Sequence, residues 1–132
     1  MSILTTELLF EYFVDFAPLL VSVLLLWTGI SCLRNPIGLA QTFGIPNATP
    51  SEVVFFQSST GRNMAAAVFI WVLVYLQERR ILGYFFLCWT WAGVADTKLL
   101  YEHSRGEKLL MHMRNVFVLS LLGPLLIRSS KG

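Results

Sequence analysis

The sequence predicts an all-α fold: an antiparallel four-helix transmembrane bundle with a short interfacial helix between the first two spans. The chain of 132 residues is 55% hydrophobic and only 14% charged, with a mean hydropathy of +0.64, whereas ordinary soluble domains carry roughly 25% charged residues. Four segments are long enough to cross a hydrocarbon core about 30 Å thick, and their apolar residues surround the helix instead of lining one face. These segments are residues 16–33, 53–76, 81–101 and 109–127. We therefore expect residues 1–132 to form a single integral membrane domain.

Charge and cysteine content exclude several other classes of protein. The formal net charge is +2 and the basic residues are scattered, so the sequence lacks the basic patch of a nucleic-acid-binding protein. Cys32 and Cys88 both lie in apolar segments, and we interpret them as small core residues rather than as a disulfide or redox pair. His103 and His112 do not have the helical spacing of zinc ligands. We expect no metal, no other cofactor and no nucleic-acid partner.

The first span, residues 16–33, contains no charged residue. Glu7, Glu11 and Asp15 precede it at intervals of four residues, which places them on one stripe of a helical extension. No Lys or Arg precedes the apolar run, so the N-terminus lacks the positively charged region of a cleavable signal peptide. We interpret the acidic stripe as a face exposed to solvent or to lipid head groups.

The connection after the first span predicts the short interfacial helix. Asn35 can cap its N-terminus, and Pro36 can occupy its first position, where a missing backbone N–H is tolerated. The helix is expected to run to Phe43 and to stop at Gly44, because glycine readily adopts the left-handed backbone conformation that ends helices.

The second span begins at a capping box. Thr49 and Glu52 have the spacing at which the hydroxyl of the first residue caps the helix and the carboxylate of the second reaches back to its amide. We therefore interpret Glu52 as structural. Residues 77–80 form a short polar turn that makes the second and third spans antiparallel neighbours, and residues 102–108 form the polar connection to the fourth span.

A charge inside the second span gives the first indication of function. A charged residue at the centre of a membrane helix costs about 2.5–3.5 kcal/mol on insertion scales, so Arg62 is expected to face the protein interior and to have a partner. We term the membrane side on which this span begins the B side; both termini lie on the opposite A side. Arg62 lies about 18 Å from the B end of its helix, near mid-depth.

Two further polar residues reach the same half of the bundle. Asp96 lies about 22 Å along the third span, which starts on the A side, and His112 lies close to the start of the fourth span on the B side. We expect Arg62, Asp96 and His112 to share one cavity open toward B. Arg62 and Asp96 are expected to approach to direct or water-mediated hydrogen-bond distance.

Each of these residues also has a purely structural interpretation. Arg62 and Asp96 could form a buried ion pair that fixes the register of the helices without chemistry. His112 could be an interfacial residue, or it could form a hydrogen bond to the polar loop from the start of its helix. Arg114 could extend its guanidinium to the head groups. Trp89 precedes Asp96 closely enough to line its pocket, although it could equally serve packing.

Short motifs along the chain carry a family resemblance. They are Arg34-Asn35-Pro36, Ala40, Phe43-Gly44-Ile45-Pro46, Gly61-Arg62-Asn63, Asp96 and His112. In these motifs, which cover nearly the whole chain, the sequence resembles the DUF4267 group of small four-helix membrane proteins, themselves similar in look to DoxX-like proteins. Such proteins occur often in fungi, including beside genes for polyketide and terpenoid assembly. The resemblance thus implies secondary-metabolite biosynthesis, a lipophilic small-molecule substrate, and the endoplasmic reticulum or another endomembrane as location.

By analogy with small membrane enzymes of such pathways, the resemblance implies epoxide hydrolysis or epoxide-opening cyclisation. This chemistry needs a base for water or a substrate hydroxyl and an acid for the departing oxygen. Under this hypothesis Asp96 is the base, Arg62 orients it, and His112 donates the proton. The substrate-binding residues would be Asn63, Asn115 and Trp89. The Asp-Arg-Asp arrangement of soluble epoxide hydrolases of comparable size is not reproduced, because no second Asp is evident at this depth.

Two other functions are compatible with the same residues. A proton-shifting isomerase would use the same acid and base, whereas a non-enzymatic module would bind a lipid, a quinone or a partner helix in the same cleft. In either case Gly29, Gly61, Gly93 and Gly123 would let helices approach closely. The expected partners are the lipophilic substrate and membrane lipid, and a homo-oligomer is left open.

Overall fold

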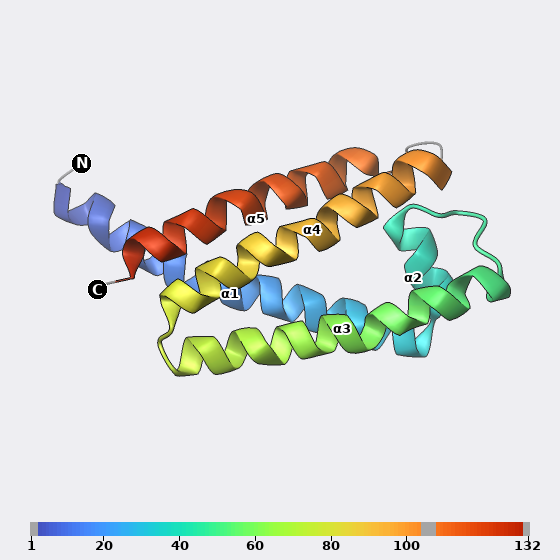
Figure 1. Ribbon diagram of the computed structural model, residues 1–132, viewed down its shortest axis with the longest axis horizontal. Helices are drawn as coiled ribbons and strands as arrows, with labels where there is room; N and C mark the ends of the chain where they lie inside the picture. Colours follow the sequence, from blue (N-terminus) through green and yellow to red (C-terminus); the bar gives the residue numbers. More distant parts are fainter. Residues whose placement is uncertain (1–2, 104–107, 131–132) are drawn as a thin grey trace.

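A computed structural model describes residues 3–103 and 108–130, and in those residues the chain forms five helices and no strand. The helices are α1 (Ile3–Arg34), α2 (Pro36–Phe43), α3 (Pro50–Tyr75), α4 (Arg79–His103) and α5 (Leu109–Ser129) (Figure 1). The all-α prediction is therefore confirmed. The four predicted spans lie within the four long helices, except for residue 76, which is the C-cap of α3.

The long helices associate as two pairs, α1 with α3 and α4 with α5 (Figure 1). In the α1–α3 pair, Trp71 Nε1 donates a hydrogen bond to Ser22 Oγ at 2.6 Å, and Asn63 Nδ2 donates one to Thr28 Oγ1 at 3.2 Å. Higher residue numbers on one helix thus meet lower numbers on the other, so the pair is antiparallel. Polar side chains that bond across apolar helices are typical of helix contacts in membranes.

Glycines bring the backbones of both pairs close together. A Cβ atom added to Gly29 of α1 would lie 2.6 Å from Met64 Cγ of α3, and one added to Gly83 of α4 would lie 2.6 Å from the carbonyl oxygen of Gly123 of α5. Gly93 likewise packs against α5. The expected close approach holds for Gly29, Gly93 and Gly123 but is wrong for the glycine at position 61, which has no atom within 4 Å of such a Cβ.

The apolar core joins the two pairs at the end of the molecule that contains the turn between α3 and α4. We call this end the A end, and the opposite end, where α2 lies, the B end. The buried residues of the core come from all four long helices: Val14, Ile70, Leu73, Leu82, Phe86, Leu122 and Leu126. In Figure 1, α3 and α4 lie close together at the turn that connects them and diverge toward the opposite end, where α2 lies. The core therefore holds the A end together, and the B end is wider.

The predicted helix caps at the B end are present. Asn35 Oδ1 accepts a hydrogen bond from the Gly38 amide at 2.9 Å, and Gly44 ends α2 with a φ of 124°. At the start of α3, Glu52 Oε2 accepts hydrogen bonds from the amide and the hydroxyl of Thr49 at 2.7 and 2.6 Å. These local interactions end one helix and start the next, and they confirm that Glu52 is structural.

Two helices of the described chain are long and apolar enough to cross a membrane, over Thr5–Arg34 and Leu109–Ser129. The helices α3 and α4 contain 26 and 25 residues, but their more polar sequences do not meet the same criterion. Length and composition of two helices indicate membrane association only weakly. The arrangement of four antiparallel spans with an interfacial α2 stays a prediction.

Candidate functional site

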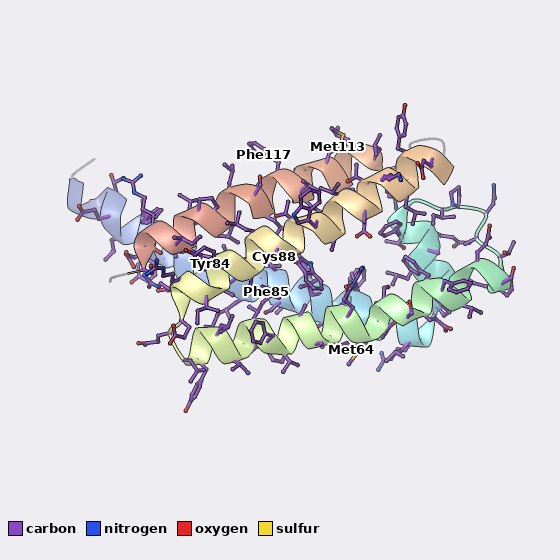
Figure 2. All side chains as sticks on the ribbon, viewed as in Figure 1. Met64, Tyr84, Phe85, Cys88, Met113 and Phe117 are labelled. Atoms are coloured by element: carbon purple, nitrogen blue, oxygen red, sulfur yellow. The ribbon has the colours of Figure 1, made fainter. Side chains whose placement is uncertain are left out.

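Arg62 reaches from α3 to α4. Its guanidinium carbon lies 5.8 Å from the centroid of the Trp89 ring, a distance at which the cation is attracted to the face of the indole. Trp89 stacks on Phe85 with ring centroids 5.5 Å apart, and Phe85 contacts Phe69 of α3 edge to face at 5.4 Å. Figure 2 labels Phe85 on the side of α4 that faces α3. An aromatic row with one cation at its B-side end thus lies between the two helix pairs.

Asp96 lies on the same face of α4 as Trp89, seven residues or about two turns further on. Its side chain is half-buried, and Arg62 and His112 both lie near enough for their charges to act on its carboxylate. Asp96 of α4 therefore lies within electrostatic range of Arg62 of α3 and of His112 of α5.

Arg62 and Asp96 do not form a direct ion pair. Among the described residues, the ion pairs with N···O distances up to 4.0 Å do not include either side chain. The expectation of a direct hydrogen bond between Arg62 and Asp96 is therefore wrong, because the Arg62 guanidinium lies over the Trp89 ring instead. A water-mediated contact stays a prediction. Two opposite charges thus lie near each other without neutralising each other through direct contact.

His112 is buried, with 8% of its surface exposed. Its Nε2 lies 3.1 Å from the carbonyl oxygen of Phe43, and the two rings are 4.4 Å apart. A carbonyl oxygen only accepts hydrogen bonds, so Nε2 carries the hydrogen. The nitrogen that remains for proton transfer is Nδ1.

Of the three predicted substrate-binding residues, only Trp89 lies beside the Arg62 guanidinium. Trp89 lies in the group, under Arg62. Asn63 uses its amide nitrogen to bind Thr28 in the α1–α3 pair, so it faces a different helix from Arg62. Asn115 lies exposed on α5. Trp89 thus lies beside Arg62, Asn63 packs in the α1–α3 pair, and a ligand contact of any of the three stays a prediction.

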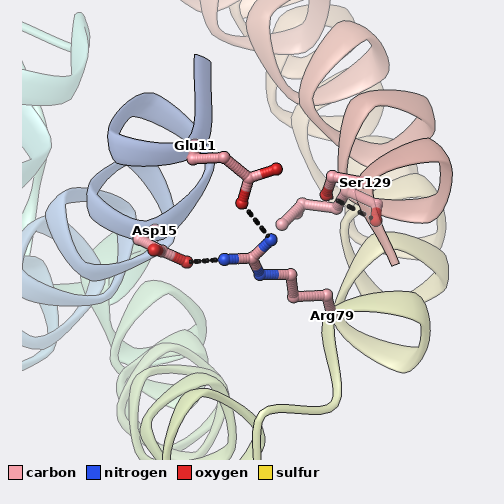
Figure 3. Close-up of polar contacts among 5 residues, drawn as sticks. Glu11, Asp15, Arg79 and Ser129 are labelled. Carbon is pink, nitrogen blue, oxygen red and sulfur yellow. Dashed lines mark hydrogen bonds and ion pairs between the residues drawn. The ribbon is translucent and has the colours of Figure 1, made fainter. Parts of the chain in front are cut away.

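A second polar cluster, which sequence reasoning missed, lies at the A end. Arg79 donates hydrogen bonds to Glu11 Oε2 and Asp15 Oδ1, both at 2.6 Å (Figure 3). The pKa of Arg79 is raised above its ordinary value, mainly by the hydrogen bond to Glu11. Partial burial of the guanidinium lowers the pKa but does not cancel this effect. The acidic stripe of α1 was expected to face solvent or head groups. The sequence places the acidic stripe and Arg79, the first residue of α4, on the same A side, but it does not indicate that they form ion pairs.

The cluster borders the larger of two described cavities. This cavity has a volume of about 950 Å³, with Glu11, Asp15 and Arg79 on its polar side and Val14 and Leu126 among its apolar walls. A smaller cavity of about 330 Å³ lies beside the same end of α1. Neither borders the Arg62, Asp96 and His112 group. Within the described residues, no group of three or more His, Cys, Asp or Glu side chains is arranged to hold a metal ion.

Comparison with family models finds one match, the domain of unknown function DUF4267, over residues 22–126. The chain belongs to the DUF4267 family. The match includes all the long helices except the first part of α1 and the last residues of α5, and it therefore contains every member of the Arg62, Asp96 and His112 group. No curated protein and no solved structure matched this DUF4267 chain. The similarity in look to DoxX-like proteins stays a prediction.

Proposed function

We propose that α1, α3, α4 and α5 of this DUF4267 protein all cross a membrane as an antiparallel bundle, with α2 at the B-side interface. The support is the apolar outer surface of all four helices, since contiguous exposed apolar surface marks contact with a membrane or a partner. Exposed side chains include Trp27 on α1, Phe55 on α3, Trp91 on α4 and Phe117 on α5. Reagent accessibility of single cysteines at Thr6 and Ser51 tests the topology. They should label from opposite sides, and labelling of both from one side would contradict it.

We further propose that the Arg62, Asp96 and His112 group binds a lipophilic small molecule and opens an epoxide on it. The observation that carries this proposal is the unpaired state of the opposite charges: Arg62 lies over Trp89, and Asp96 forms no direct ion pair among the described residues. A structural ion pair would place both charges in contact, because each is costly to leave alone in apolar surroundings. Charges held apart near an aromatic face are available to a ligand.

The proposed reaction follows from the three side chains. The Asp96 carboxylate takes a proton from water, or from a hydroxyl of the substrate, as that oxygen attacks one epoxide carbon. The C–O bond of the epoxide breaks, and the departing oxygen takes the Nδ1 proton of a protonated His112. The proton on Asp96 then returns to His112 through water, which restores both groups. Arg62 stabilises the Asp96 carboxylate electrostatically, and its guanidinium carbon lies 5.8 Å from the centroid of the Trp89 ring.

The substrate is expected to enter from the bilayer between the two helix pairs, and water to enter from the B side. The buried core lies at the A end, and α3 and α4 diverge from their connecting turn toward the B end (Figure 1), so we propose the route at that end. We place the protein in the endoplasmic reticulum or another endomembrane, on the basis of the family resemblance. Fractionation of cells that express the full chain tests the compartment.

Product analysis with lipophilic epoxides tests the reaction. Membranes that contain the wild type should convert a polyketide- or terpenoid-like epoxide to a diol or a cyclic ether. Asp96→Asn should lower the turnover about 10²–10⁴-fold, the usual contribution of a general base. Glu102→Gln is the matched control, because Glu102 is an exposed carboxylate on the same helix whose pair with Lys98 spans 3.7 Å; its turnover should equal the wild type.

Two outcomes would redirect the proposal. Unchanged product formation in both Asp96→Asn and His112→Ala would show that the assigned catalytic roles are wrong. Stabilisation of the wild type by the epoxide without any product would favour a binding module. Arg62→Lys separates the role of Arg62 from that of simple charge, because an ammonium group lacks the planar fork with which a guanidinium orients a carboxylate. The turnover of this variant should fall about tenfold.

A further inference from the structure

The C-terminal end of α2 lacks backbone partners for its last two carbonyl groups. Gly44 donates its N–H to the carbonyls of Ala40 and Gln41. No backbone N–H of the described chain reaches the carbonyls of Thr42 or Phe43. The final carbonyls of a helix need partners from elsewhere.

Two side chains of the α5 region supply these partners. Lys108 Nζ donates to the Thr42 carbonyl at 2.7 Å, and His112 Nε2 donates to the Phe43 carbonyl at 3.1 Å. Lys108 is the N-cap of α5 and His112 lies in the first turn of that helix, so both side chains come from the same end of α5. The negative end of the α2 dipole favours positive charge at this position. The two contacts together attach the end of α2 to the start of α5.

Ring packing further restricts the same end of α2. The Phe43 ring lies 4.4 Å from the His112 ring and 5.3 Å from the Phe56 ring of α3. Phe43 is thus held between α5 and α3, and the backbone carbonyl that receives the His112 hydrogen bond cannot move without disturbing both contacts. His112 is itself buried, so its ring has little freedom to turn.

We propose that α2 is the positioning element for His112: the Phe43 carbonyl holds Nε2–H, Lys108 holds the same helix end, and Nδ1 is thereby presented to the Asp96 side for proton transfer. This inference rests on the proposed function. Phe43 and Lys108 are positioning residues, since neither touches the reacting atoms. The hydrogen bond to the carbonyl persists in both protonation states of His112, because Nε2 carries a hydrogen in each. Only Nδ1 then gains and loses a proton during turnover.

A spectroscopic measurement tests the contact itself. The sample is the full chain in lipid, with 15N-labelled histidine and with phenylalanine labelled at the carbonyl carbon. The substitution His103→Gln ensures that His112 gives the only histidine signal. Solid-state recoupling should connect Nε2 with a phenylalanine carbonyl carbon, and the neutral ring should show Nδ1 without a hydrogen. Absence of this recoupling, or a hydrogen on Nδ1 alone, overturns the inference.

Substitutions at the α2 end test the role. Gly44→Ala strains a backbone at φ 124°, which alanine rarely adopts, and so shifts the end of α2. A displacement of about 1 Å at a catalytic group can cost about 10²-fold, so kcat should fall about 10- to 100-fold while KM stays within about twofold. Lys108→Met should lower kcat about three- to tenfold and weaken the recoupling signal. Lys98→Met is the matched control, because Lys98 is an exposed lysine that contacts only Glu102 among described ion pairs.

The outcomes separate this role from the proposed function. A wild type that converts no epoxide overturns both. The other outcome concerns an active wild type. If its Lys108→Met and Gly44→Ala variants keep full kcat although the recoupling signal is lost, only the positioning role is overturned. Retained helical content in each variant, measured by circular dichroism, ensures that a fall in kcat does not reflect unfolding.

Discussion

Alanine at Gly83 should weaken the packing of α4 on α5. The added Cβ would lie 2.6 Å from the Gly123 carbonyl oxygen and 2.6 Å from Ile127 Cγ1, whereas ordinary contacts begin at 3.4 Å. A backbone carbonyl cannot rotate away, so the helices must separate locally by about 0.8 Å. Overpacking of this kind costs about 1–3 kcal/mol, and alanine regains up to about 1 kcal/mol in helix propensity. We expect Gly83→Ala to lower the free energy of unfolding by about 1–2 kcal/mol.

The chain contains its own control for this substitution. Gly61 also lies inside a long helix, yet no atom lies within 4 Å of an added Cβ. Gly61→Ala should therefore be neutral or raise the free energy of unfolding by up to about 1 kcal/mol. Reversible unfolding in detergent by increasing dodecyl sulfate, followed by circular dichroism, measures both variants. Equal shifts in the same direction would refute the assignment of Gly83 to a close backbone contact.

Two further substitutions test single contacts between helices. Arg79→Gln should lower the free energy of unfolding by about 1 kcal/mol, because its two ion pairs are partly exposed and such pairs are weak. Arg80→Gln is the control and should leave the free energy of unfolding unchanged. Added salt should reduce the difference in stability between the wild type and Arg79→Gln. An effect of Arg79→Gln that is insensitive to salt would contradict the ionic origin. Trp71→Phe removes the N–H that binds Ser22 together with part of the ring, and the lost hydrogen bond should cost about 0.6 kcal/mol beyond the packing change, the average for a membrane hydrogen bond. The same loss in Trp71→Phe made on a Ser22→Ala background would show that this hydrogen bond is not its cause.

Features that depend on neighbouring residues were predictable from the sequence. Asn35, Gly44 and the Thr49–Glu52 capping box act over three or four residues, and each appears in the structure as its spacing predicts. The bounds of α3, α4 and α5 lie close to the ends of their apolar runs, whereas α1 begins at Ile3, well before its apolar run. The family match over residues 22–126 agrees with the motifs that these elements contain.

Contacts between distant residues were only partly predictable. Depth along antiparallel helices placed Arg62, Asp96 and His112 in one region, but depth does not give the direction of a side chain around its helix. Arg62 accordingly lies over Trp89 rather than against Asp96. The pairing of Arg79 with the acidic stripe depends on how two helix pairs meet, which no local pattern encodes. Likewise, the period of a helix does not tell which glycine faces a neighbour, and so Gly83 was missed.

The connectivity of the two helix pairs has a consequence for synthesis. The partner of α1 is α3, which follows only after α2, whereas α4 and α5 are consecutive and can form a hairpin as soon as both exist. During translation α1 therefore waits for α3, and the second pair completes itself without help from the first. A break in the chain within the turn at residues 76–78 would leave each pair intact on its own polypeptide. Two separately translated halves should therefore recombine into the same molecule, held by the core at the A end and by the Arg79 contacts.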